Sequence, residues 1–146
     1  KQELTRSMEA IEETHQFQIV FFNQDAKAFN PAGERRLAFG TAHNKRIAQN
    51  FMATIIPDGG TEHEPALMMA LSMKPDVIFF LSDAGIPQMT AAQLERIHRA
   101  AGTTTINAIE YGRGTRPVAK NFLGRLASQN GGQHVYVDIT PYIGRP

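Results

Sequence analysis

The feature that most constrains the fold is an unbroken apolar run over 77–81, which follows Lys74-Pro75-Asp76 and leads into Ser82-Asp83. Five successive apolar residues between turn-forming segments are typical of a strand buried on both faces. Such strands occur almost only in parallel sheets whose two faces are covered by helices. The run therefore predicts a central parallel strand in an α/β sheet, with Asp83 at its C-terminal end.

The rest of the chain alternates helical and strand patterns around this run. Helices are predicted over 1–15, from an N-cap at Asn44 to Pro57, over 62–73, from a capping box formed by Thr90 and Gln93 to Gly102, and over 117–128. Strands are predicted over 17–22, 26–29, 77–81, 103–109 and 133–139, with surface loops over 31–43 and 110–114. This order predicts a Rossmann-like, doubly wound, mostly parallel sheet with one short antiparallel edge strand and helices on both faces. We expect one domain over 1–139 and a tail or linker over 140–146.

Two oxygen-bearing side chains are predicted at the ligand-binding edge of this sheet. The turn Asp58-Gly59-Gly60 leads to Thr61 before a helix, and the run over 77–81 leads to Asp83. In open α/β sheets, the C-terminal strand ends and the adjoining helix N-termini form the binding crevice. Hydroxyl and carboxylate oxygens are ligands of Mg²⁺, which takes six ligands and usually keeps several waters. Two interpretations stay open at this point. Thr61 and Asp83 are either two ligands of a metal site, or Thr61 is a helix N-cap and Asp83 a turn residue.

Composition limits the classes of partner. The 15 basic and 14 acidic residues leave a formal charge of +1, too small a field to hold nucleic acid or an anionic membrane. We interpret the basic cluster as a solvated face; it consists of Arg35, Arg36, His43, Lys45 and Arg46. The absence of cysteine excludes disulfides and thiolate zinc sites. No apolar run approaches the roughly 20 residues that a membrane helix needs.

The order and spacing of four segments resemble the von Willebrand factor type A (vWA) domain, over nearly the whole chain. These segments are 17–22 with its hairpin, Gly59-Gly60-Thr61 followed by Ala66-Leu67, 76–83, and 126–132 before the last strand. The resemblance implies a metal-ion-dependent adhesion site, where Mg²⁺ or Mn²⁺ completes its coordination with an acidic residue of a partner protein. It maps the metal ligands onto Thr61 and Asp83, and it implies no enzyme activity and no catalytic residue.

The chain departs from the family pattern in two ways. Ala84 stands where the family most often has glycine, and no Asp-x-Ser-x-Ser motif occurs in the sequence. That motif belongs to the family's first strand, which would lie just upstream of residue 1. We therefore expect an N-terminally incomplete domain that lacks the first central strand and binds metal weakly or not at all by itself. Strands 17–22 and 77–81 would flank the vacant position, which predicts their collapse onto each other or self-association through it.

Three functions stay open. The first is a protein-binding module whose metal site captures a partner's carboxylate. The second is a hydrolase or transferase that binds phosphate at Gly59-Gly60-Thr61, with Asp83 or His63 as acid or base. The chain has no Walker lysine, no Gly-x-Ser-x-Gly elbow and no Gly-x-Gly-x-x-Gly after a first strand, which disfavours the second function. The third is a structural vWA-like module without metal. Because similar domains often sit on membrane-anchored bacterial proteins, we expect an extracytoplasmic or membrane-tethered parent.

Overall fold

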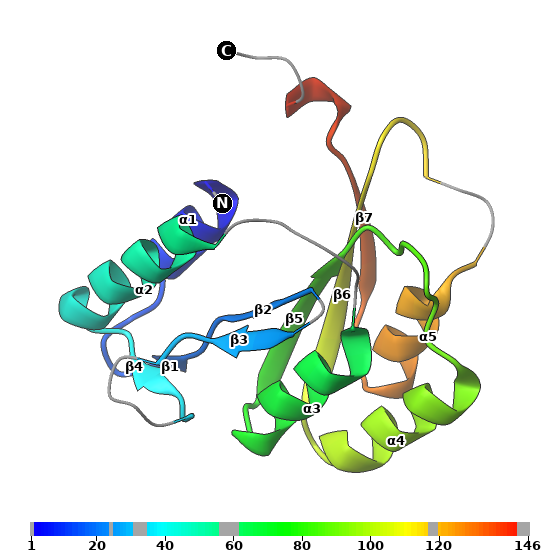
Figure 1. Ribbon diagram of the computed structural model, residues 1–146, viewed down its shortest axis with the longest axis horizontal. Coiled ribbons are helices and arrows are strands. Elements are labelled where there is room, and N and C mark those ends of the chain that lie inside the picture. Colours follow the sequence, from blue (N-terminus) through cyan, green and yellow to red (C-terminus); the bar gives the residue numbers. More distant parts are fainter. Residues whose placement is uncertain (1, 24, 31–34, 56–61, 117–119, 143–146) are drawn as a thin grey trace. The chain divides into compact units, whose positions relative to one another are not determined.

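The computed structural model describes residues 2–23, 25–30, 35–55, 62–116 and 120–142 (Figure 1). The chain divides into two compact units, residues 1–73 and 74–146. The first unit contains α1 (Gln2–Glu9), β1 (Gln16–Phe17), β2 (Val20–Phe22), β3 (Ala26–Ala28), β4 (Ala38–Phe39), α2 (Ala42–Thr54) and α3 (His63–Ser72). The second contains β5 (Val77–Ser82), α4 (Ala91–Ala101), β6 (Thr105–Gly112), α5 (Phe122–Gln129), β7 (His134–Asp138) and the 3₁₀ helix η1 (Thr140–Tyr142). The mixture of helices and strands, with a parallel sheet flanked by helices in the second unit, confirms the predicted α/β class.

In the first unit, the single strand predicted over 17–22 is wrong. The segment forms β1 and β2, which pair antiparallel with β4 and β3 respectively. The Gln18 side chain lies at the break, where its Oε1 accepts from the Ile19 N–H at 2.8 Å and its Nε2 donates to the Arg36 carbonyl at 2.9 Å. These bonds satisfy backbone groups that have no partner strand at the break between β1 and β2. Strand β4 also corrects the prediction of loop over 31–43, whereas the short antiparallel strand near 26–29 is confirmed.

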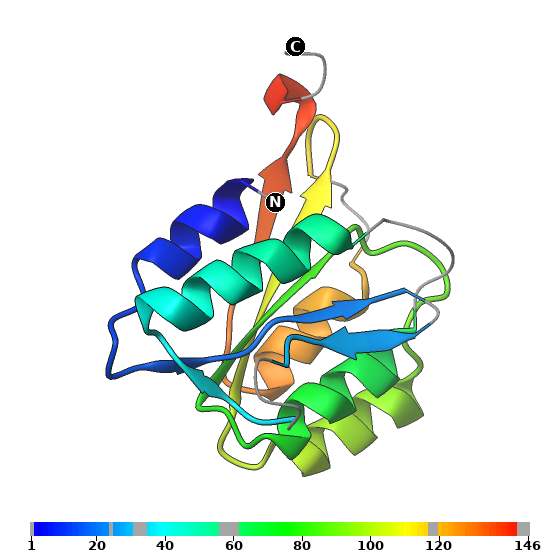
Figure 2. The same ribbon diagram turned by 60° about the vertical axis from the view of Figure 1, so that its left-hand side comes forward.

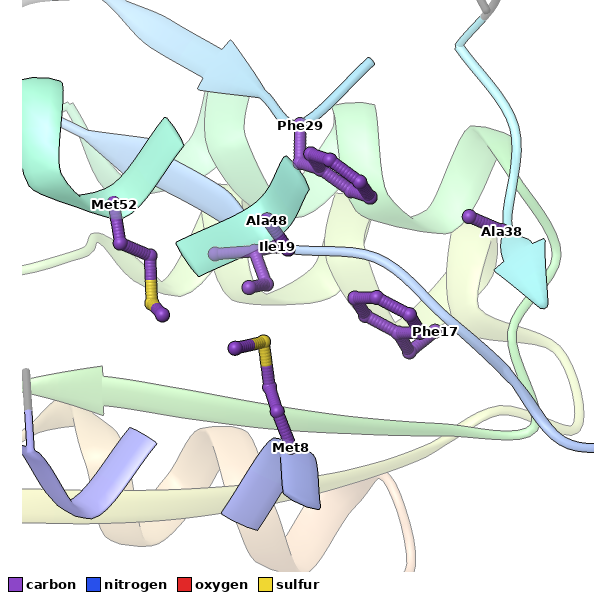
Figure 3. Packing of buried hydrophobic residues seen from close by; sticks show 7 residues of the cluster. All are labelled: Met8, Phe17, Ile19, Phe29, Ala38, Ala48 and Met52. Carbon is purple, nitrogen blue, oxygen red and sulfur yellow. The ribbon is translucent and has the colours of Figure 1, made fainter. Parts of the chain in front are cut away.

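The main buried cluster of the first unit lies between α1, α2 and the segments that contain its short strands (Figure 3). Its buried side chains are Met8, Phe17, Ile19, Phe29, Ala38, Ala48 and Met52. The rings of Phe17 and Phe29 stack with centroids 5.7 Å apart. Near the end of α1, the Lys45 ammonium donates to the carbonyls of Glu9, at 3.1 Å, and Ile11. A cation at the C-terminal end of a helix stabilises the helix. The prediction that Lys45 belongs to a solvated basic face is therefore wrong for this residue.

Two helices begin at residues that differ from the predictions. Helix α2 is capped by Thr41, whose Oγ1 accepts from the Asn44 N–H at 3.2 Å, so Asn44 is inside the helix. Helix α5 begins at Phe122, five residues after the predicted start at 117, and its cap is Asn121, whose Oδ1 accepts from the Leu123 N–H at 3.0 Å. Both capping residues are types that compete well for free backbone N–H groups at a helix start. Patterns of apolar residues locate the helices but not their first residues.

The second unit is a three-stranded parallel sheet in the order β5–β6–β7, with α4 and α5 on one face (Figures 1 and 2). The buried side chains between helices and sheet include Phe80, Leu94, Ile97, Ile106, Ala108, Leu123 and Leu126. The predicted capping box at Thr90 is confirmed, because Thr90 Oγ1 accepts from the Gln93 N–H and Gln93 Oε1 accepts from the Thr90 N–H. Gly102 ends α4 with a φ of +55°, as predicted from its C-cap position.

Strand β5 differs from its prediction as a central strand buried on both faces. It is an edge strand of its three-stranded sheet, and its side chains alternate between a more exposed and a more buried face. Phe80 is 4% exposed, whereas Phe79 is 64% exposed. Successive side chains point to opposite faces of a sheet, and α4 and α5 cover only one of them. The predicted vacant strand position next to β5 stays a prediction. No helix within the described ranges is long and apolar enough to cross a membrane.

Candidate functional site

Asp83 lies directly after β5, at the C-terminal end of the parallel sheet, as predicted. Its side chain is exposed, and its Oδ1 accepts from the Gly85 N–H at 3.0 Å. The Ser82 Oγ accepts from the Ala84 N–H at 3.2 Å. These two bonds fold the chain into a tight turn, because short polar side chains can replace backbone acceptors. Among the described residues, Asp83 Oδ2 has no hydrogen-bond partner, so one carboxylate oxygen is left for a ligand.

The backbone of this turn is shaped around the Asp83 carboxylate. Ala84 has a φ of +53°, in the left-handed region that L-residues rarely adopt. A Cβ atom added to Gly85 would lie 2.9 Å from Asp83 Oδ1. A larger residue at 85 would therefore displace the Asp83 carboxylate from its present position.

The Gln88 side chain holds the loop from Asp83 to α4 through hydrogen bonds at both of its ends. Gln88 Nε2 donates to the carbonyls of Ala84 and, at 3.3 Å, Gly85. Gln88 Oε1 accepts from the Phe122 N–H at 3.4 Å, at the start of α5. Between these fixed points, Ile86 is 87% exposed. We call this loop (83–90) and the loop after β6 (113–116) the rim, because both follow C-terminal strand ends.

The second rim loop is held by the ends of β6 and β7. Asp138 Oδ1 accepts from the Gly114 N–H at 2.9 Å, the Thr140 N–H at 2.8 Å and the Thr140 hydroxyl at 2.6 Å. The Tyr136 hydroxyl donates to the Gly114 carbonyl at 3.2 Å. We call Gly114, Tyr136, Asp138 and Thr140 the clamp. It fixes Gly114, and the loop residues on either side of it are exposed.

The clamp changes the pKa values of its two acidic groups. Hydrogen bonds from the Thr140 side chain, and then from the Thr140 and Gly114 backbones, lower the pKa of Asp138. Partial removal from water, and then the charges of Asp138 and Glu110, raise the pKa of Tyr136. At neutral pH the Asp138 carboxylate is therefore charged, and its Oδ1 already accepts three hydrogen bonds.

A buried polar pair next to the sheet was not predicted. Glu110 belongs to β6 rather than to the predicted loop over 110–114, and its Oε2 lies 2.8 Å from His134 Nε2. Arg116 Nη2 lies 2.9 Å from His134 Nδ1. Because a guanidinium only donates, Nδ1 must accept, which leaves Nε2–H to donate to Glu110. The alternation Ile106, Ala108, Glu110 was the available signal, since it places Glu110 on the buried face of the strand.

The remaining predicted site residues belong to the first unit or lie outside the described residues. Thr61, with Gly59 and Gly60, lies outside the described residues. Glu62 occupies the N-cap position of α3 without a side-chain capping bond. His63 is buried, with its ring 5.8 Å from that of Phe22 in an edge-on arrangement. Within the described ranges, no three His, Asp or Glu side chains are grouped so that they could hold a metal ion.

Comparison with solved structures shows a vWA-like fold. The chain is similar to a structure described as von Willebrand factor type A from Catenulispora acidiphila, with a TM-score of 0.76 and 18% identity. That match covers 92% of this chain and 32% of the other, so the chain spans about a third of that protein's length. An uncharacterized membrane spanning protein from Vibrio fischeri matches with a TM-score of 0.39 and 16% identity, over 93% of this chain and 74% of the other. No protein-family model and no curated protein matches this sequence.

Proposed function

We propose that this chain is part of a protein-interaction module in which the rim binds a partner protein through a divalent cation, with Asp83 as a metal ligand. The proposal rests on the exposure and the hydrogen bonding of the Asp83 carboxylate. One oxygen is oriented by the Gly85 N–H, and the other has no partner among the described residues. An exposed, oriented carboxylate at the C-terminal end of a parallel strand lies where open α/β sheets bind ligands.

Among the described residues, Asp83 fits Mg²⁺ or Mn²⁺ as one ligand. Asp83 supplies one hard oxygen, which is the ligand type that these ions prefer. Thr61 is the proposed second ligand and lies outside the described residues. Waters and a carboxylate from the partner would complete six-fold coordination. A bound cation would attract that carboxylate, and with so few protein ligands we expect weak affinity for the ion alone.

The position of His63 disfavours its role as acid or base in the alternative function. In the alternative function, His63 or Asp83 would act as acid or base on a bound phosphate compound. His63 is only 3% exposed and packs edge-on against Phe22, as a core residue does. A general acid or base must reach the substrate within hydrogen-bond distance. The buried ring of His63 does not meet this requirement.

Thermal unfolding with and without divalent salt tests the proposal. We expect MgCl₂ or MnCl₂ to raise the Tm of the chain above its value in NaCl of equal ionic strength. An ion at about ten times its Kd adds about 1.4 kcal/mol to the free energy of unfolding. Asp83→Asn should abolish this rise, because it removes the charged ligand and keeps the shape of the side chain.

Asp76→Asn is the matched control. Asp76 is also exposed and directly precedes β5, at the end opposite to Asp83. This variant should respond to divalent salt as the wild type does. If divalent salt still raises the Tm of Asp83→Asn, or no longer raises that of Asp76→Asn, Asp83 is not the metal ligand.

A further inference from the structure

We propose that Glu110, His134 and Arg116 form a pH-sensitive latch, in which protonation of His134 releases Arg116 and with it the end of the rim loop over 113–116. The inference goes beyond the proposed function, because it concerns how this loop is held and requires neither a cation nor a partner. All three side chains belong to the second unit. The latch makes the shape of the rim respond to pH.

The first support is the hydrogen-bonding state of the His134 ring. Arg116 Nη2 lies 2.9 Å from His134 Nδ1, and Glu110 Oε2 lies 2.8 Å from His134 Nε2. Because a guanidinium has no acceptor, Nδ1 must offer its lone pair, and the ring proton is on Nε2. The bond to Arg116 therefore requires a neutral ring. A proton and Arg116 compete for the same lone pair of Nδ1, and each excludes the other.

The second support is the enclosure of this pair by the sheet and α5. The side chains of His134 and Glu110 are 11% and 6% exposed. A Cβ atom added to Gly124 of α5 would lie 3.3 Å from His134 Nδ1, so the helix backbone is close to the ring. Water screens charges less in such a setting than at the surface. An imidazolium here repels the guanidinium of Arg116, which is exposed and free to move into water.

Glu110 favours the exchange of Arg116 for a proton. Its Oε2 accepts from Nε2–H of the neutral ring, and the same bond persists when the ring is protonated. The carboxylate then lies next to an imidazolium instead of a neutral imidazole. The proton thus replaces Arg116 as the cation of this buried cluster.

The other charged groups around His134 leave this exchange intact. Strand β7 packs against β6 and α5. Besides the latch residues, these two elements and the loop over 113–116 carry two charged residues, both exposed cations: Arg113 and Arg125. Within β7, Tyr136 and Asp138 are bonded in the clamp. Histidine is the side chain whose charge ordinarily changes between pH 5 and 8, whereas tyrosine stays neutral and aspartate charged there.

The clamp confines the release to the Arg116 end of the loop. Asp138 Oδ1 accepts from the Gly114 N–H at 2.9 Å, a bond in which His134 takes no part. Hydrogen bonds from Thr140 lower the pKa of Asp138, so its carboxylate stays charged at mildly acid pH. We therefore expect Arg116 to be released at a pH where Gly114 stays in place.

NMR titration of the isotopically labelled chain from pH 8 to pH 5 tests the inference. The imidazole signals of His134 and the Nε–Hε signal of Arg116 should change with the same midpoint, whereas the Gly114 amide signal should not follow them. Arg116→Ser should raise the midpoint of the His134 titration by about 0.5 pH unit or more, because the proton no longer competes with a guanidinium. His134→Gln should make the Arg116 signal independent of pH in this range.

Arg113→Ser is the matched control, because Arg113 is an exposed arginine of the same loop and is not a latch residue. It removes the same charge and should leave the His134 midpoint nearly unchanged. Equal shifts in the two serine variants would overturn the inference, since they would reflect the net charge of the loop and not a bond to Arg116.

Two further results would overturn the latch. One is an Arg116 signal that does not follow the titration of His134, and the other is a His134 ring that keeps one protonation state from pH 8 to pH 5. If His134→Gln does not fold, Arg116→Ser still tests the latch, because it changes an exposed residue. None of these results depends on the Asp83 cation test.

Discussion

Ala84 has the least favourable backbone conformation at the rim. Its φ of +53° places the Cβ in a crowded position, and Lys74 is the other described non-glycine residue with a positive φ. The resemblance to vWA domains predicts glycine at 84, and the structure shows why glycine suits this position. The turn keeps this conformation because the Ala84 N–H donates to Ser82 Oγ and the next N–H donates to Asp83. Strain in this turn therefore accompanies the orientation of the proposed ligand.

Replacement of Ala84 by glycine should stabilise the chain. A left-handed L-residue costs about 1–2 kcal/mol, and the greater freedom of glycine in the unfolded state offsets about 0.4–1 kcal/mol of that gain. We expect Ala84→Gly to raise the free energy of unfolding by up to about 1 kcal/mol, measured by urea unfolding.

Ala92→Gly is the control for this substitution, because Ala92 is exposed within α4. Glycine in a helix costs about 1 kcal/mol, so this variant should be less stable than the wild type. If Ala84→Gly destabilises the chain as Ala92→Gly does, the turn is not strained at Ala84.

At the scale of elements, β5 has two unlike faces. Phe79 and Phe80 are neighbours in the same strand, with exposed fractions of 64% and 4%. The Phe80 ring lies 6.5 Å from that of Phe122 in an edge-on arrangement, beneath the helices. The stability of the second unit should therefore depend on one face of the strand far more than on the other.

Alanine substitution at these two positions measures the difference. Phe80→Ala should lower the free energy of unfolding by about 3–5 kcal/mol, because it leaves a cavity in the core. Phe79→Ala should cost much less, since its ring is already largely in water. Equal losses, measured by urea unfolding of both variants, would show that the outer face of β5 is also covered.

The clamp links the ends of β6 and β7 to η1 through hydrogen bonds to the Asp138 carboxylate. Because these bonds lower the pKa of Asp138, the contribution of the clamp to stability depends on pH. A carboxyl whose pKa is depressed on folding stabilises the folded state above its unfolded pKa, and this stabilisation is lost as pH falls through the folded pKa. Thr140→Val removes the hydrogen bond that contributes most to the shift. The Tm of wild type should exceed that of Thr140→Val at pH 7, and the difference should shrink below the ordinary carboxyl pKa of about 4.

Thr115→Val serves as the control for the clamp, because Thr115 is exposed in the same loop and is not a clamp residue. Its Tm should follow that of wild type at every pH. A Tm difference between wild type and Thr140→Val that is constant from neutral to acid pH would show that Asp138 is not the group responsible.

At the scale of the whole molecule, the sequence predicts elements better than pairings. The capping box at Thr90 and the strand after Asp76 are local patterns, and both lie where predicted. The division of 17–22 into two strands depends on β4, which is distant in sequence and too short to show a pattern. The apolar run 77–81 could not reveal that one face is exposed, because burial depends on which elements cover the sheet. Asp83 could be placed because a strand end is a local feature.

The fold and the function rest on different observations. Similarity over 92% of the chain with a TM-score of 0.76 shows a vWA-like fold. Fold alone does not imply function, which depends on the side chains of a site. The interaction proposed for this chain therefore depends on Asp83 and on the rim around it.

Addition of Mn²⁺ to the isotopically labelled chain, followed by NMR, tests the central claim most directly. A paramagnetic ion broadens nearby signals even when it binds weakly. The account predicts that the amide signals of Ala84 and Gly85 broaden first. Those of Asp76 and Val77, about 20 Å away along the six residues of β5, should stay sharp. Asp83→Asn should remove this selectivity. Uniform broadening, broadening centred elsewhere, or an unchanged pattern in Asp83→Asn would contradict the claim that Asp83 binds the cation.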